Sequence, residues 1–131
     1  MHQQKDDERR PIVAKGDDIE DRMIDFAVVV IEICAELPQT LAGRHVAGQL
    51  VRSGTAPAPH YSEARGAESR RDFIHKLGIC LKELNESKVW LKIATRSGMS
   101  IEERTGPALV ECQELSRIIN SSIQTARRNQ Q

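Results

Sequence analysis

Three cysteines and three internal histidines are the residues of this chain that could bind a metal ion: Cys34, Cys80, Cys112, His45, His60 and His75. Zinc requires a tight ligand geometry, and paired ligands usually lie close together in sequence. The cysteines are odd in number, far apart and never in CxxC spacing. No Glu is followed three residues later by His, which excludes the motif of di-iron carboxylate bundles. We therefore expect no metal and no other cofactor, and we interpret the cysteines as small buried apolar side chains.

A second set of polar residues follows a pair of prolines. His60, Tyr61 and Glu63 come directly after Pro57 and Pro59, and each proline breaks a helix by removing an amide hydrogen. Polar side chains at such a kink usually satisfy the freed backbone carbonyls, and we expect Glu63 to pair with Arg52 or Arg70. The alternative hypothesis is a small-molecule or enzymatic site at the kink, formed by these three residues. On balance the sequence predicts a protein that is not an enzyme.

A basic cluster lies at the expected turn between the second and third helices, and it comprises Arg65, Arg70, Arg71 and Lys76. Such a cluster can contact the phosphates of a nucleic acid. Carboxylates are interleaved with it, and no aromatic platform that could stack unpaired bases lies nearby. We interpret the cluster first as a salt-bridged corner and second as a candidate nucleic-acid contact.

Composition sets wider limits on function. The chain has 131 residues and a mass of 14.7 kDa, and its nineteen basic and nineteen acidic residues cancel. Bulk charge therefore does not hold it on nucleic acid or membrane, although a local patch can. Only 3% of the residues are aromatic, which favours helices over a sandwich or barrel. The longest nearly apolar run, residues 26–31, is too short to cross a bilayer. We expect a cytoplasmic protein with no membrane segment.

The elements that position these residues are all expected to be helical. Residues 1–16 are polar and without periodicity, so we predict a flexible tail followed by one bundle domain at 17–131. Apolar residues recur at alternating steps of three and four, and they predict helices at 18–37, 40–65, 69–97 and 101–127. The second helix should be kinked near Pro57 and Pro59. Four helices with short links predict an all-α, up-down-up-down bundle.

Capping patterns mark where these helices begin and end. Three starts are predicted from a cap and an acidic residue three positions later: Asp17 with Glu20, Ser69 with Asp72, and Ser100 with Glu103. Gly66 and Gly98 are predicted to end the second and third helices.

Two helices carry more apolar surface than a single bundle can hide. The surplus residues lie outside the core-facing periodicity and are Ile24, Val28 and Ile31 in the first helix, and Ile74, Leu81 and Trp90 in the third. An exposed apolar patch of this size usually marks an interface. The pattern therefore predicts self-association through these six residues.

Several motifs together resemble the small four-helix-bundle family encoded in intervening sequences of bacterial 23S ribosomal RNA genes. The motifs are Gln49-Leu50-Val51-Arg52-Ser53-Gly54-Thr55, Tyr61-x-Glu63-Ala64, Ser69-Arg70-Arg71-Asp72-Phe73-Ile74, Leu81-Lys82-Glu83-Leu84 and Trp90-Leu91. The likeness extends over about residues 19–128. One departure is His60, which stands where family members usually carry Asn.

The resemblance implies a left-handed bundle that assembles as a ring-shaped homopentamer and has no established enzymatic activity. It also implies a relation to the accessory protein of diversity-generating retroelements, a basic pentamer that binds reverse transcriptase and RNA. This chain is neutral, unlike that basic branch. We expect a non-enzymatic scaffold whose surface or central opening binds RNA or a protein partner.

Overall fold

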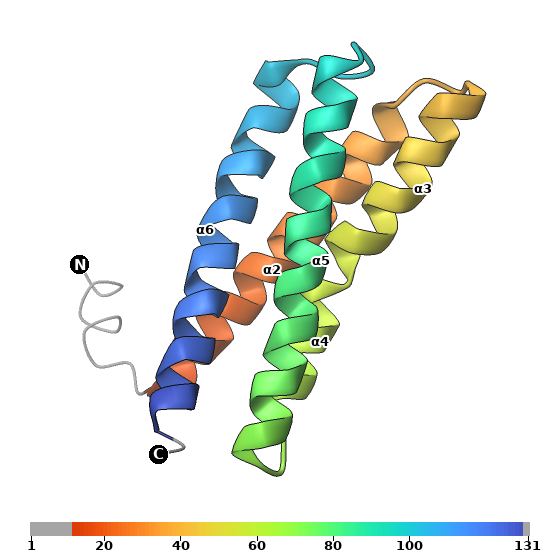
Figure 1. Ribbon diagram of the computed structural model, residues 1–131. Helices are drawn as coiled ribbons and strands as arrows, with labels where there is room; N and C mark the ends of the chain where they lie inside the picture. The colour runs from red at the N-terminus through yellow and green to blue at the C-terminus, as the bar shows by residue number, and fades with distance from the viewer. Residues whose placement is uncertain (1–11, 130–131) are drawn as a thin grey trace, which may run out of the picture.

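The computed structural model describes the backbone of residues 12–129 and the side chains of residues 16–129. Within them every regular element is a helix: α2 (Ile12–Glu36), α3 (Leu41–Thr55), α4 (Pro57–Arg65), α5 (Arg70–Arg96) and α6 (Glu102–Arg128). The short helices α3 and α4 together form one bent arm, so the molecule has four arms side by side (Figure 1). The predicted all-α four-helix fold is confirmed.

The four arms occupy the corners of the bundle in chain order. Helix α2 contacts the bent arm and α6, and α5 also contacts the bent arm and α6. In the described chain the backbones of α2 and α5 do not run side by side, so the two helices lie at diagonal corners, with α2 behind α5 in Figure 1. They meet only through core side chains, such as the sulfur atoms of Met23 and Cys80, which are 3.9 Å apart. Between them lies a core of fully buried side chains, the largest of which include Met23, Ile33, Leu50, Leu84 and Leu115.

The bend in the second arm occurs where the sequence predicts it. The turn at Ala56 separates α3 from α4, and Pro57 opens α4 at a position where a missing amide hydrogen costs nothing. The carbonyl of Pro57 lies 3.5 Å from the thiol of Cys80 on α5, which donates to it. Just before the bend, the hydroxyls of Ser53 and Ser87 lie 2.9 Å apart and are fully buried.

Two predicted starts are wrong. Helix α2 begins at Ile12, so residues 12–16 are helix and Asp17 is not its cap. The expected tail over residues 1–11 lies outside the described residues. The early turns of α2 are held by tertiary contact, because Arg65 of α4 pairs with Asp17 at 2.8 Å. Such a contact cannot be read from local periodicity.

The other wrong start is the capping box at Ser100 and Glu103. The cap of α6 is Ile101, whose carbonyl accepts from the amides of Arg104 and Thr105. The amide of Ser100 is instead bonded to the carbonyl of Ala94, which ties this residue to the end of α5.

The remaining boundary signals are confirmed. The hydroxyl of Ser69 accepts from the amide of Asp72 at 3.0 Å, and Gly66 is the C-cap of α4 directly after its last residue, Arg65. After α5, Gly98 has a φ of 80°, a backbone conformation that favours glycine.

Alanine substitutions at two glycines of α3 are expected to change the free energy of unfolding in opposite directions. A Cβ atom on Gly54 would lie 2.6 Å from Val30 Cγ1, whereas one on Gly48 would meet nothing within 4 Å. We expect Gly54→Ala to lower the free energy of unfolding by about 1–3 kcal/mol through overpacking. The matched control Gly48→Ala should raise it by up to about 1 kcal/mol through helix propensity. Urea unfolding at one protein concentration measures both, and a stabilising Gly54→Ala would contradict the close packing.

Candidate functional site

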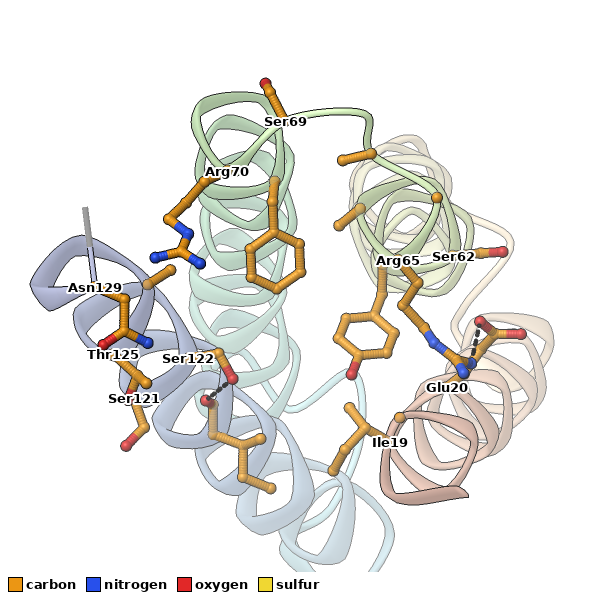
Figure 2. A pocket seen from close by; sticks show the side chains of 18 of the residues that line it. Ile19, Glu20, Ser62, Arg65, Ser69, Arg70, Ser121, Ser122, Thr125 and Asn129 are labelled. Atoms are coloured by element: carbon orange, nitrogen blue, oxygen red, sulfur yellow. Dashed lines mark hydrogen bonds and ion pairs between the residues drawn. The ribbon is translucent and has the colours of Figure 1, made fainter. Parts of the chain in front are cut away.

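An open groove of about 1620 Å³ lies at one end of the bundle. Its walls come from residues 16–20 of α2, the last turns of α4, the turn between α4 and α5, the first turn of α5 and the C-terminal half of α6 (Figure 2). Tyr61 and Phe73 line it, and both pack against the core. Figure 2 shows Arg70 and Asn129 near α6 and, on the opposite side, Arg65 facing Glu20 of α2. The groove thus combines aromatic side chains with a polar and charged rim.

The predicted basic cluster is divided by the fold. Arg65 pairs with Asp17 at 2.8 Å and with Glu20 at 3.3 Å, and these bonds raise its pKa. Lys76 pairs with Asp72 at 3.4 Å, one turn earlier on α5. Two of the four cations are therefore neutralised, which confirms the salt-bridged interpretation for that half of the cluster.

The other half of the cluster remains available. Arg70 and Arg71 are exposed and have no carboxylate partner within residues 16–129. Arg70 lines the groove, whereas Arg71 does not.

The structure does not bring the three kink residues together. Tyr61 is half-buried and lines the groove, and burial raises the pKa of its phenol. Neither His60 nor Glu63 lines the groove. At about 100° per residue, Tyr61 and Glu63 lie on nearly opposite faces of α4. The geometry therefore gives no support to a shared ligand site at the bend.

The expected pairing of Glu63 is wrong. Arg52 lies 3.2 Å from Glu83 on α5 and also bonds Glu86. Glu63 is exposed, with no ion pair in the described part of the chain, and so has no salt bridge to Arg70 either. Arg52 follows α5 because α3 packs along that helix before the bend.

The cysteines have the environment of core residues. Burial raises the pKa of Cys34 to about 11 and those of Cys80 and Cys112 to about 12. The thiol of Cys112 donates to the carbonyl of Leu84 at 3.0 Å. Among residues 16–129, no three His, Cys, Asp or Glu side chains form a group suited to a metal ion. His45 instead meets the ring of Trp90 edge-on, and His75 is exposed.

The six interface candidates fall into two groups. Ile24, Val28 and Ile31 form a stripe along the outer side of α2, where each is 45–50% exposed. Ile74, Leu81 and Trp90 are half-buried and pack against the core of their own subunit. The Trp90 indole also donates to Glu86 at 3.2 Å. Of the six candidates, only the three residues of α2 therefore form an exposed apolar surface without a partner in the described chain.

On α5 the exposed apolar residues are Val89 and Ile93, which are 50% and 38% exposed. Val89 is not among the six interface candidates drawn from the sequence. Its spacing of seven residues from both Lys82 and Arg96 places these three residues on one line of the helix, and this spacing could have indicated it.

No helix in the described part of the chain has the length and apolar character to cross a membrane.

Comparison with known proteins gives a matching family and similar solved structures. Residues 17–121 match the family model described as 23S rRNA-intervening sequence protein. A crystal structure from Bacteroides thetaiotaomicron, described as a protein with unknown function from the S23 ribosomal protein family, is similar to this chain with a TM-score of 0.75 and 31% identity. That alignment covers 80% of this chain and 97% of the other. No curated protein matches.

The raised thiol pKa values predict slow modification of the native protein. A pKa of about 11 instead of the ordinary 9.0 leaves Cys34 with about 100-fold less thiolate at pH 8. We expect Ellman's reagent to react at least about 100-fold more slowly with native Cys34 than with the unfolded chain. Cys80 and Cys112 should react only after unfolding. The control Cys34→Ser should abolish the native reaction, and rapid modification of that variant would contradict burial of the other two thiols.

Proposed function

Because this chain belongs to the family of 23S rRNA-intervening sequence proteins, with a match over residues 17–121, we propose that it is a non-enzymatic scaffold that assembles as a ring-shaped homopentamer. The observation that carries self-assembly is the aliphatic stripe of Ile24, Val28 and Ile31 on the outside of α2. The number five and the left-handed twist of the bundle come from the family resemblance.

The stripe favours assembly on energetic grounds. Its three residues follow one another at steps of four and three, so they form one continuous surface. Covering the exposed half of each side chain contributes about 1 kcal/mol per residue. A contact repeated around a ring adds this gain at every junction.

The arrangement of reactive groups supports a non-enzymatic role. Cys80 and Cys112 are buried, and their thiols stay protonated at neutral pH. No described cysteine or histidine lines the groove, so the carboxylates that do, Glu20, Glu68 and Glu114, have neither a thiol nor an imidazole beside them there. The three free thiols also favour a reducing cytoplasmic location.

A second role, contact with RNA, is favoured by Arg70 and Arg71. Both side chains are exposed and lack carboxylate partners in the described chain. Both also lie at the N-terminal end of α5, where the helix dipole favours phosphate. Repetition around a ring would multiply this weak site, and a protein partner with an acidic surface would use the same two cations.

Assembly is tested by sedimentation. We expect the native chain to sediment near 74 kDa, five times its 14.7 kDa mass. Val28→Lys should yield a monomer, because the new ammonium group would have to be buried at each junction. The control Val110→Lys changes a residue that is 66% exposed on α6 and should leave the ring intact. A native chain that remains a 15 kDa particle at high concentration would refute the proposal.

RNA contact is tested with a labelled single-stranded oligonucleotide. We expect binding to weaken with salt, and the double variant Arg70→Ala/Arg71→Ala to lower the slope of log K against log salt by about 1.4 per subunit. Lys76→Ala is the control, since Asp72 already neutralises that cation. Equal binding by the native chain and the double variant would rule out this contact.

A further inference from the structure

The charges of this neutral chain are segregated between two helices. Helix α2 holds seven acidic and two basic residues, a net charge of −5. Helix α5 holds seven basic and three acidic residues, a net charge of +4. Helix α6 is balanced, with four residues of each sign. Each of the two charged helices exposes neighbouring apolar residues, whereas α3 and α6 expose only the single large apolar residues Leu41 and Val110 in the described chain.

On α2 the acidic residues flank the aliphatic stripe. Asp21, Asp25 and Glu32 are exposed, and at 100° per residue they lie on one flank of the line through Ile24 and Ile31. This acidic face of α2, defined by the three aliphatic and three acidic residues, points away from the core.

On α5 the basic residues surround Val89 and Ile93. Lys82 and Arg96 are exposed and Lys92 is half-buried, and all three share the outer side of the helix with the two apolar residues. The carboxylates of Glu83 and Glu86 lie toward α3, where Arg52 binds them. The basic face of α5, defined by these five residues, therefore keeps its positive charge.

A single subunit cannot bring the two faces together. In the described chain α2 and α5 occupy diagonal corners and meet only through buried core side chains, so their outer faces point away from one another (Figure 1). We propose that the acidic face of α2 in one copy packs on the basic face of α5 in the next copy, an inference that rests on the proposed self-assembly. Apolar residues meet at the centre of this contact, and opposite charges meet around them.

The contact joins two different surfaces, so it is head-to-tail. Each copy retains one unused face after pairing, and the chain of contacts ends only when a ring closes. A two-fold dimer through the α2 stripe alone would instead place acidic residues of two copies against one another, which electrostatic repulsion disfavours.

Gly78 fits this arrangement. It lies in the middle of α5, is exposed, and a Cβ there would meet nothing within 4 Å of its own subunit. A glycine in an exposed helix interior costs about 1 kcal/mol relative to alanine. A closely packed helix of a second copy explains its presence, because a glycine permits a short distance between helix axes.

Two complementary variants test the pairing. Val28→Lys breaks only the α2 face, because it places a cation against the basic face of the next copy. Ile93→Glu breaks only the α5 face, because it places a carboxylate against the acidic face, so each variant alone should be a monomer. Mixed together, the intact α2 face of the second variant and the intact α5 face of the first should form a 1:1 complex. Native mass spectrometry of the mixture would detect it. Circular dichroism checks that both variants keep the fold.

Covalent cross-linking of the two faces gives a second measurement, which does not require a single contact between two copies to be stable during the experiment. With the sulfhydryl cross-linker bismaleimidohexane, Val28→Cys/Ile93→Cys should give a ladder that stops at five subunits. Neither single-cysteine variant should give a ladder, because the native thiols are buried or half-buried.

The outcomes separate the two proposals. A native chain that is monomeric throughout would refute self-assembly and this pairing together. An oligomeric native chain whose assembly survives Ile93→Glu, or in which Val28→Cys alone cross-links to dimers, would overturn the head-to-tail contact and leave self-assembly standing.

Discussion

The structure depends on a close approach between the bent arm and its two neighbours just before the bend. Gly54 lies against Val30 of α2 with no room for a Cβ atom, and Ser53 bonds Ser87 of α5 with both hydroxyls fully buried. The small side chain of Ser53 and the absence of one at Gly54 thus let the bent arm contact α5 and α2 at adjacent positions. Bulkier side chains here would separate α3 from both α2 and α5.

The direction of α4 follows from that approach. Once the chain bends at Ala56, α4 runs along α5 to the end of the bundle, and its last residue, Arg65, reaches the carboxylates of Asp17 and Glu20. This contact links the N-terminal part of α2 to the end of α4. The groove between the helix ends, and the division of the basic cluster, are consequences of the same placement.

The net charge of the chain is zero, but its charges are unevenly distributed between two helices. A chain with zero formal charge carries −5 on one helix and +4 on the diagonal one. Charge separated in this way has little effect on long-range attraction to nucleic acid, because the two signs cancel at a distance. At short range the same separation gives a second copy two complementary surfaces, which connects the electrostatics to assembly.

The sequence by itself determined the helices, the bend and the surplus of apolar residues on α2, because helical periodicity, prolines and caps act within a few residues along the chain. Ser69 and Gly98 were predictable for that reason. Only the tertiary structure decided which charges are neutralised and which apolar residues remain exposed. Arg65 and Asp17 are 48 residues apart in sequence, and Trp90 is covered by His45 of another helix while Val89 is not. Burial and ion pairing depend on which helices become neighbours, and that is a property of the packed bundle rather than of any one segment.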